Sequence, residues 1–436
     1  MSLRGKKIAI LGVGRSGRAA AALAVREGAE VSAWDSAGSA AFSGLPESVE
    51  IHPHATEAEG AQLVSDILVV SPGIDTFGSY VRAFSKHAGE VIGEVELAAR
   101  YHAGRIIGIT GTNGKTTTTE LVERILAHAG LGGTACGNYG VPFAEVVLQT
   151  PAPAVVALEL SSFQLETVRS LHCDVAVWLN FAPDHMDRYP TVEAYRAAKL
   201  RIFETQTADD VAVIRQGEGI FELAAKAQYF STTDPSATWY SAGRVIEHQG
   251  ESWLDMEAET GLRGLHNAEN LMAAMAACHA LGISRAAMRE ALRGYTAPRH
   301  RCELVRVLDG VEYLNDSKAT NLHALESALR SQTRPLVLIA GGKEKGLDYS
   351  AVLPLLAERA LAAVTFGEIA RPLAGLFSSV IPCESVSSLA DAVAIARSHA
   401  PSGSTILLSP GTSSFDQFTG YEQRGNAFCD LVHQLC

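Results

Sequence analysis

The sequence lacks any apolar run near the ~20 residues that a membrane-spanning helix needs. It also lacks C-x-x-C pairs, and its 7 cysteines are widely spaced, which is typical of free thiols in a reducing compartment. The basic N-terminal stretch, MSLRGKKIAIL, passes into a glycine-rich turn without the cleavage pattern of a signal peptide. We therefore expect a soluble cytoplasmic protein with no membrane insertion.

The chain has fewer basic than acidic residues: 36 Lys and Arg against 48 Asp and Glu, which gives a formal net charge of -12. Sequence-independent nucleic-acid binding needs a basic surface that releases counterions from phosphates, so we expect no nucleic-acid partner. Hydrophobic residues make up 47% of the chain, enough to fold without disulfide or metal staples. At roughly 150 residues per domain, 436 residues indicate about three domains.

Three successive segments alternate β-branched runs with alanine-rich helical stretches. The first ends near Gly93, and the second ends near Pro298, which breaks the helical stretch REALRGY. We predict an α/β protein with three domains: residues 1–93, Rossmann-like; residues 94–298, a P-loop-type ATPase domain with a parallel sheet; and residues 299–436, Rossmann-like.

Glycines 12, 14 and 17 form G-x-G-x-x-G between an expected strand and helix, and Asp35 closes the next strand. In a dinucleotide fingerprint this turn brings backbone N–H groups up to a phosphate. A tight turn without a ligand is the alternative. An NAD enzyme would also need a catalytic partner region, and the sequence offers none.

The stretch GITGTNGKTTTTE follows a strand and opens a helix, which is the context of a phosphate-binding loop. Amides around Gly111 to Gly114 would meet oxyanions, Lys115 would add a point charge and Thr116 could hold Mg²⁺. The loop departs from the G-x-x-x-x-G-K-[ST] spacing because Ile109 stands where the first glycine is expected. The alternative is a glycine turn with an exposed lysine.

Glu159 ends the strand AVVALEL, and Asp184 and His185 follow the strand DVAVWLN. Both strands should end at the rim that carries the phosphate loop, where ligands of open α/β sheets bind. A carboxylate there suits Mg²⁺, whereas an imidazole is an unusual ligand, and a structural histidine is the alternative. Lys199 lies in the helical stretch VEAYRAAKLRIFE, whose pattern predicts a solvated lysine.

Asn267 and Asn270 lie three apart on one helical face, where Asn267 either caps the helix or binds a ligand. In the third segment, polar residues gather after strands in HRCELV, NDSKATN, GGKEKGLD and SPGTSSFDQFTGYEQRG. Such loops are where sites are built. Capping and turn formation are the alternative for Asp316, Ser317 and Ser414.

In order, GTNGKTT, LELSSFQLE, DHMDRY, YRAAKLRIF, HNAENLMAA, PRHR, NDSKATN and SPGTSSFDQF resemble the Mur ligase family from end to end. The last two, with EQRG, are similar to the branch that adds D-glutamate to UDP-N-acetylmuramoyl-L-alanine. The resemblance implies an ATP-dependent ligase that forms an acyl phosphate. It implies three domains that close around UDP-N-acetylmuramoyl-L-alanine, D-glutamate and ATP, and we expect a monomer.

By motif position, the resemblance places UDP rather than NAD in the first domain, at Arg15, Ser16, Asp35, Ser71 and Gly73, with Asn138 nearer the muramoyl end. It places ATP at Gly111, Thr112, Asn113, Gly114, Lys115, Thr116 and Thr117, with Asn270, Arg301 and Asp316 around the nucleotide. Two Mg²⁺ ions would be held by Thr116, Glu159, His185 and Lys199, the last as a carbamate formed with CO₂. Lys115, His185 and Lys199 would be the catalytic residues.

For D-glutamate the resemblance implies Lys318, Thr320, Lys345, Ser414, Phe415 and Tyr421, with Lys343 as an alternative to Lys345. Three other interpretations stay open. Another ligase of the family would share the ATP loop but lack the SPGTSSFDQF context. A nucleotide-binding regulatory protein would not need Glu159, His185 and Lys199 together. The third is an NAD-dependent dehydrogenase.

Overall fold

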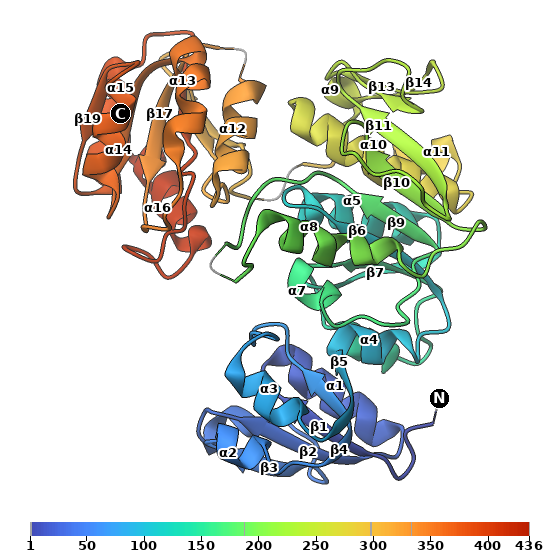
Figure 1. Cartoon of the computed structure of the whole chain (residues 1–436). Helices are drawn as coiled ribbons and strands as arrows, with labels where there is room; N and C mark the ends of the chain where they lie inside the picture. Colours follow the sequence, from blue (N-terminus) through green and yellow to red (C-terminus); the bar gives the residue numbers. More distant parts are fainter. Residues whose placement is uncertain (1, 187, 297–298, 333, 436) are drawn as a thin grey trace. The chain divides into compact units, whose positions relative to one another are not determined.

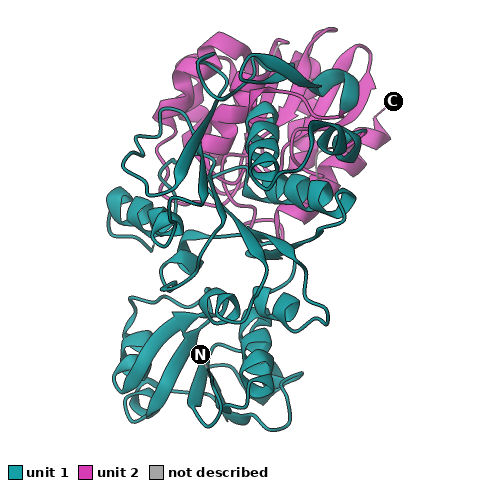
Figure 2. Cartoon of the chain, turned by 90° about the vertical axis from the view of Figure 1, so that its right-hand side faces the viewer, with its two compact units in different colours: residues 1–259, 267–293 teal, residues 260–266, 294–436 magenta. Residues whose placement is uncertain are grey.

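The computed structural model describes residues 2–186, 188–296, 299–332 and 334–435. The chain forms two compact units, unit 1 with residues 1–259 and 267–293, and unit 2 with residues 260–266 and 294–436 (Figure 2). The predicted α/β class is confirmed, with two sheets in unit 1 and one in unit 2. The three domain boundaries stay predictions, and Pro298, on which one of them was placed, lies outside the described residues.

Unit 1 begins with a parallel sheet in the order β3-β2-β1-β4-β5 (Figure 1). Both faces are covered, so β1 and β4 are almost entirely apolar and buried. The order reverses between β1 and β4, and ligands of open α/β sheets bind at such a switch point. The strands are β1 (Lys7–Leu11), β2 (Glu30–Asp35), β3 (Glu50–Pro53), β4 (Ser65–Val70) and β5 (Ala88–Gly93), and the helices are α1 (Arg15–Arg26), η1 (Ser39–Phe42), α2 (Glu57–Gly60), α3 (Ser79–Ser85) and α4 (Glu94–Ala99).

The second sheet of unit 1 has the order β14-β13-β12-β11-β10-β9-β6-β8-β7. Its switch point is at β6, with β8 on one side and β9 on the other. Its strands are β6 (Arg105–Thr110), β7 (Gly132–Gly137), β8 (Val155–Glu159), β9 (Val175–Trp178), β10 (Val211–Arg215), β11 (Lys226–Ser231), β12 (Trp239–Tyr240), β13 (Val245–His248) and β14 (Glu251–Asp255). The helices are α5 (Lys115–His128), α6 (Phe143–Val147), α7 (Ser162–Leu165), α8 (Val192–Leu200), η2 (Arg201–Phe203), α9 (Met256–Glu259), α10 (Leu265–Ala280) and α11 (Arg285–Leu292).

This sheet departs from the predicted parallel arrangement at one edge, where β12, β13 and β14 pair antiparallel. The cause is local. β13 and β14 are joined by two residues, Gln249 and Gly250, with φ of 51° and 80°. Positive φ at both positions is the signature of a type I′ hairpin turn, which can connect only antiparallel strands.

The sheet of unit 2 has the order β15-β16-β20-β17-β18-β19 and is parallel except for the hairpin β15–β16. That hairpin turns at Asp309 and Gly310, with φ of 53° and 80°. The strands are β15 (Glu303–Leu308), β16 (Val311–Asn315), β17 (Leu336–Gly341), β18 (Ala360–Phe366), β19 (Cys383–Ser385) and β20 (Thr405–Leu408). The helices are α12 (Leu322–Ser331), η3 (Tyr349–Val352), α13 (Leu353–Arg359), α14 (Ala370–Phe377), α15 (Leu389–His399) and α16 (Tyr421–Gln434).

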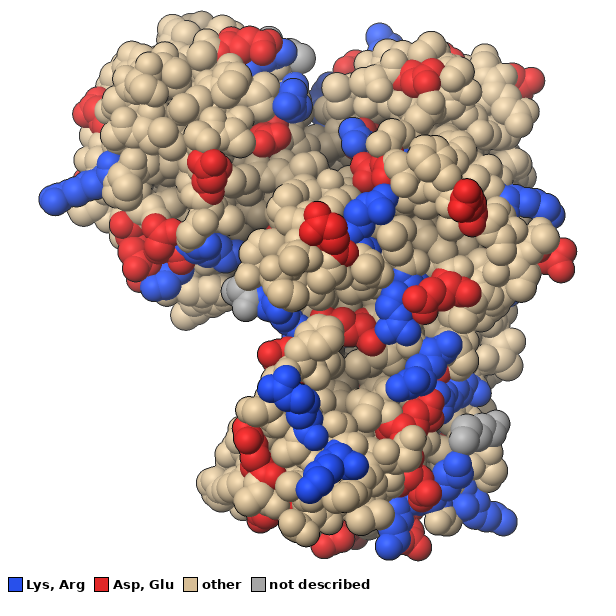
Figure 3. All heavy atoms as spheres, in the orientation of Figure 1, with Lys and Arg blue, Asp and Glu red and all other residues tan. Residues whose placement is uncertain are grey.

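Charge is mixed over the surface drawn in Figure 3, where basic and acidic side chains alternate without a broad area of either sign. Among the described residues, no helix is both long enough and apolar enough to cross a membrane.

Candidate functional site

The phosphate loop connects β6 to α5 in unit 1. Gly111 and Gly114 adopt φ of 153° and 84°, which side chains disfavour, and Gly114 directly precedes the helix. A Cβ at Gly114 would lie 2.3 Å from Oδ1 of Asn270, so the asparagine packs directly against the loop. The Asn113 N–H donates to Oδ1 of Asn180 at 2.9 Å. The loop is therefore shaped in advance to present its amides at a helix N-terminus, where oxyanions bind.

Two lysines converge on this loop. Lys115 Nζ donates to the carbonyl oxygens of Gly111 and Thr112, each at 2.9 Å, and Lys199 Nζ donates to the same Gly111 oxygen at 2.8 Å. Lys199 is 1% exposed, so the expectation of a solvated lysine was wrong. Burial, and then the charge of Lys115, lower the pKa of Lys199 well below its ordinary value. A neutral amine at this position is the form that can react with an electrophile.

Glu159 ends β8 beside the loop and is 2% exposed. Its Oε1 accepts a hydrogen bond from Asn138 Nδ2 at 2.7 Å, which brings these two predicted residues together. Its Oε2 is buried and has no hydrogen-bond partner among the described residues. A buried carboxylate oxygen without a donor is costly, and a cation would satisfy it.

His185 lies on a turn with φ of 58°, with its ring centroid 4.9 Å from that of Phe163 and 5.9 Å from that of Tyr195. Its side chain is 44% exposed. Within the described part of the chain, no three His, Cys, Asp or Glu side chains form a metal site by themselves. Mg²⁺ usually takes only one or two carboxylates and completes its shell with substrate phosphates and water, so Glu159 beside the phosphate loop fits this ion.

Asn267 and Asn270 lie within α10, where the Asn270 amide donates to Oδ1 of Asn267 at 3.5 Å. The helix begins at Leu265, two residues before Asn267, so the interpretation of Asn267 as its cap was wrong. Asn270 Oδ1 also accepts from the Thr118 hydroxyl at 3.4 Å. Both asparagines are thus fixed beside the phosphate loop rather than at a helix end.

A cavity of about 570 Å³ lies at the switch point of the first sheet. Its walls include five residues that were predicted from the resemblance, Arg15, Ser16, Asp35, Ser71 and Gly73. Asp35 accepts hydrogen bonds from the N–H groups of Val13 and Ala37, each at 2.9 Å, and the Ser71 hydroxyl donates to the Gly12 carbonyl at 2.8 Å. These bonds fix the glycine turn and the loop after β4 around the cavity. Asn138 is not among the residues that line it.

Unit 2 carries the other predicted residues on loops after its parallel strands. Lys318 Nζ lies 3.8 Å from the centre of the Tyr421 ring, a cation–π contact. Ser414 is buried, whereas Phe415 is 70% exposed. Lys345 and Thr320 are at least partly accessible. Lys343, the alternative to Lys345, pairs with Glu368 at 2.9 Å, which leaves its ammonium group less available.

Asp316 is buried in unit 2 and does not cap a helix. Its carboxylate accepts from the Ser409 hydroxyl at 2.9 Å and from the Cys302 N–H at 3.2 Å. Burial raises the pKa of Asp316 to about 7. Arg301 lies in the same unit between two residues in the left-handed region, His300 and Cys302, with φ of 66° and 48°.

Arg424 was not predicted as a site residue, although its motif, EQRG, was noted. Its guanidinium is fully buried and donates to the Ser317 hydroxyl and carbonyl at 2.9 and 2.8 Å and to the Thr412 carbonyl at 3.2 Å. It therefore joins the loop that carries Lys318 to the loop that carries Ser414. A basic residue three positions after a predicted contact, Tyr421, on the same helical face was the available signal.

The chain matches two protein families, the Mur ligase middle domain over residues 109–278 and the Mur ligase glutamate ligase domain over residues 300–411. It is 39% identical over 454 residues to UDP-N-acetylmuramoylalanine–D-glutamate ligase of Acidobacterium capsulatum, covering 99% of this chain and 97% of that protein. It is 40% identical over 445 residues to the protein of the same name from Solibacter usitatus, covering 100% and 99%.

Solved structures share the fold. The MurF ligase of Thermotoga maritima in complex with ADP has a TM-score of 0.63 at 14% identity, covering 99% of this chain and 96% of that one. UDP-N-acetylmuramate-alanine ligase MurC of the same organism has a TM-score of 0.61 at 17% identity, covering 98% and 99%. At these identities the likeness concerns the fold alone.

Proposed function

The chain belongs to the Mur ligase family, and on that premise we propose that it adds D-glutamate to UDP-N-acetylmuramoyl-L-alanine at the expense of ATP. The reaction forms an amide and releases ADP and phosphate. The single observation that carries the proposal is the convergence of Lys115, Lys199 and the unpartnered Glu159 oxygen on one phosphate loop. A protein that only bound nucleotide would not need that arrangement.

A carboxylate does not react with an amine unaided, so the L-alanyl carboxylate first attacks the γ-phosphorus of ATP and becomes an acyl phosphate. Phosphoryl transfer needs positioning and charge neutralisation more than covalent help. The amides of residues 111–117 hold the phosphates, and the Lys115 ammonium group moves from loop carbonyls to a phosphate oxygen. Asn270, beside Gly114, holds the loop and meets the nucleotide, and Arg301 and Asp316 complete the ATP contacts.

Thr116, Glu159 and His185 would hold two Mg²⁺ ions, together with Lys199 as its carbamate. When bound, the ions neutralise phosphate charge. Carbamylation joins the neutral Lys199 nitrogen to the carbon of CO₂ and releases one proton, so a neutral amine becomes an anionic oxygen ligand. The lowered pKa of Lys199 supports this step because the reacting form is the free amine.

The amine of D-glutamate attacks the acyl carbon through a tetrahedral oxyanion, and phosphate leaves. We assign the amino acid to Lys318, Thr320, Lys345, Ser414, Phe415 and Tyr421 of unit 2. The UDP group of the other substrate occupies the 570 Å³ cavity with Arg15, Ser16, Asp35, Ser71 and Gly73, and Asn138 contacts its muramoyl end. We further propose that the enzyme works as a cytoplasmic monomer in peptidoglycan precursor synthesis, and hence in cell-wall growth and division.

The decisive experiment measures phosphate release from Mg-ATP with UDP-N-acetylmuramoyl-L-alanine, comparing D-glutamate with L-glutamate, L-lysine and meso-diaminopimelate. Release should require D-glutamate and vanish in Lys115→Ala. It should persist in Lys226→Ala, which removes an exposed lysine at the start of β11 in the same unit. Turnover only with another acceptor would overturn the specificity. No turnover with any acceptor would favour a nucleotide-binding regulatory protein.

A further inference from the structure

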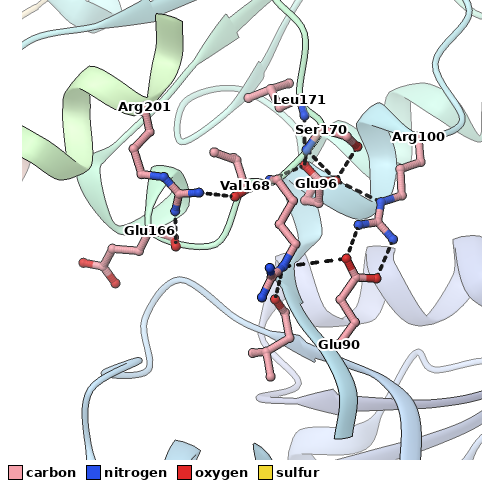
Figure 4. Close-up of polar contacts among 10 residues, drawn as sticks. Glu90, Glu96, Arg100, Glu166, Val168, Ser170, Leu171 and Arg201 are labelled. Atoms are coloured by element: carbon pink, nitrogen blue, oxygen red, sulfur yellow. Dashed lines mark hydrogen bonds and ion pairs between the residues drawn. The ribbon is translucent and has the colours of Figure 1, made fainter. Parts of the chain in front are cut away.

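The loop after α7 is clamped from both sides in unit 1 (Figure 4). The carboxylate of Glu96 accepts the backbone N–H groups of residues 169–171 at 2.9 to 3.1 Å. From the other side, Arg201 donates to the carbonyl oxygens of Leu165, Glu166 and Val168 at 2.6 to 3.1 Å. An anion holds the amides and a cation holds the carbonyls, so the backbone of this loop is fixed.

The anionic side of the clamp is fixed in turn. Arg100 Nε donates to Glu96 at 2.9 Å, and its two terminal nitrogens donate to Glu90 at 2.9 and 2.6 Å. Glu96 is fully buried, and although burial opposes it, hydrogen bonds from Ser170 and nearby amides lower the pKa of Glu96. The carboxylate therefore stays ionised and the clamp stays closed at neutral pH.

Glu166 projects its own carboxylate away from this clamp (Figure 4), with its side chain 3% exposed. That carboxylate accepts from three donors on two different segments: the Thr76 hydroxyl at 2.5 Å, Arg188 Nη2 at 2.6 Å and the Tyr189 hydroxyl. A buried ion pair usually stabilises a fold less than apolar side chains of the same size would. We therefore infer that the pair of Glu166 and Arg188 serves to align the segment at Thr76 with the segment at residues 188–189.

Thr76 connects Glu166 to the 570 Å³ cavity that we assign to the UDP group. Thr76 follows directly on residues 71–75, all of which line that cavity. Arg188 adds a second link, because its Nη1 donates to the Pro72 carbonyl at 3.4 Å and its Nη2 to the Thr76 hydroxyl at 3.4 Å. A displacement of residues 71–75 therefore changes the hydrogen bonds that Glu166 accepts.

Arg188 connects Glu166 to His185. The backbone N–H groups of Arg188 and Tyr189 both donate to the His185 carbonyl at 3.0 Å, and the Phe163 ring contacts Arg188 on one hand and His185 on the other. The left-handed φ of His185, 58°, is unfavourable for a residue with a Cβ. Such a conformation persists only where its surroundings enforce it.

We propose that Glu166 is a positioning residue that couples occupation of the UDP cavity to the placement of His185 beside the phosphate loop. The inference rests on the proposed function, because it assigns the two sites to the two substrates of that reaction. By linkage the coupling is mutual: the UDP-bearing substrate tightens Mg-nucleotide binding by the same factor that Mg-nucleotide tightens binding of the substrate.

Calorimetry on the full chain tests this. The dissociation constant of the Mg²⁺ complex of the β,γ-imido ATP analogue is measured with and without saturating UDP-N-acetylmuramoyl-L-alanine. We expect the wild type to bind the nucleotide at least about fivefold more tightly with the substrate present. The ratio of the dissociation constant without the substrate to the one with it should fall to within about twofold of one in Thr76→Val, which removes one hydroxyl and keeps the shape of the side chain. The same result is expected for Glu166→Gln.

Ser85→Ala is the matched control. Ser85 lines, together with Thr76 and Glu166, a second cavity of about 330 Å³ in unit 1, but its hydroxyl donates to the Arg82 carbonyl and not to Glu166. This variant should keep the wild-type ratio. If Glu166→Gln does not fold, Thr76→Val alone decides. A wild-type ratio near one, or an unchanged ratio in Thr76→Val, would overturn the inference. Turnover with D-glutamate is a separate readout, so failure of the proposed function is recognised independently.

Discussion

The side-chain nitrogens of Lys115 and Lys199 share one acceptor, the carbonyl oxygen of Gly111, at 2.9 and 2.8 Å. Burial makes it costly to charge Lys199, and repulsion from Lys115 adds to that cost, so both lower the pKa of Lys199. The folded protein therefore favours a neutral Lys199 beside a charged Lys115. This single carbonyl brings the phosphate-binding lysine and the lysine proposed to be carbamylated to the same point.

Lys199→Met should raise the thermal unfolding midpoint without ligands and lower turnover by at least about 100-fold. Below the ordinary lysine pKa the unfolded chain binds a proton that the folded protein resists, so this lysine makes wild-type stability rise with pH. The unfolding midpoint of the methionine variant should therefore rise less between pH 7 and pH 9 than the midpoint of the wild type does. Lys226→Met, at an exposed position, is the control, and a shared slope change would contradict the prediction.

Gly114→Ala should abolish measurable Mg-ATP binding, because the added Cβ would meet Asn270 Oδ1 at 2.3 Å. Gly130→Ala separates this clash from backbone strain, since Gly130 also has a positive φ, 72°, but has no atom within 4 Å of the added Cβ. Both variants should lose about 1 kcal/mol of stability from the left-handed conformation. Nucleotide titration should show loss of binding only in Gly114→Ala, and equal effects would refute the steric explanation.

Asp35→Ala should raise the KM for UDP-N-acetylmuramoyl-L-alanine by about tenfold or more and leave the KM for ATP unchanged. The carboxylate anchors the Val13 and Ala37 amides at the cavity. Asp66→Ala removes a similar bond, to the Lys7 N–H at 2.7 Å, from the opposite end of the same sheet. Steady-state kinetics should leave the control at wild-type KM, and a rise in both variants would indicate general destabilisation instead.

Arg424→Lys should raise the KM for D-glutamate by about tenfold, because a point charge cannot bridge Ser317 and Thr412 as a planar guanidinium does. Arg306→Lys is matched to it, since Arg306 also donates to backbone carbonyls of unit 2 but is not linked to the Lys318 or Ser414 loops. Steady-state kinetics at varied D-glutamate concentrations should show a raised KM in Arg424→Lys and a wild-type KM in Arg306→Lys. An unchanged KM in Arg424→Lys would show that the bridge is dispensable.

Glu94→Gln should flatten the pH dependence of stability. Burial raises the pKa of Glu94 from 4.5 to about 7 in the folded state. Between these values the folded protein holds a proton that the unfolded chain has lost, so wild-type stability falls as pH rises, by up to about 3 kcal/mol. Urea unfolding at pH 5 and pH 8 measures the difference, with Glu47→Gln, at an exposed position of the same unit, as the control. A wild-type slope in Glu94→Gln would rule out this carboxyl as the cause.

The sequence predicted features that depend on short stretches of chain. The phosphate loop was identified because strand, glycines, lysine and helix are contiguous around Gly111. The antiparallel edges were missed although each has a local signal, Asp309-Gly310 and Gln249-Gly250. The burial of Lys199 had no such signal, because its helix pattern does not reveal that the lysine points at a carbonyl 88 residues away. The Glu166 network joins segments up to 116 residues apart and was likewise not predictable.

One outer strand of each of the three sheets resists pairing with strands of other chains. β3 ends in Pro53, which has no N–H to offer, β19 spans only Cys383–Ser385, and β14 carries acidic residues at both ends, Glu251 and Asp255. Each of these features discourages a foreign strand from adding to an open sheet edge. We therefore expect these three edges not to pair with strands of other chains at the high local concentrations of overexpression, where long, flat, apolar edges assemble into fibres.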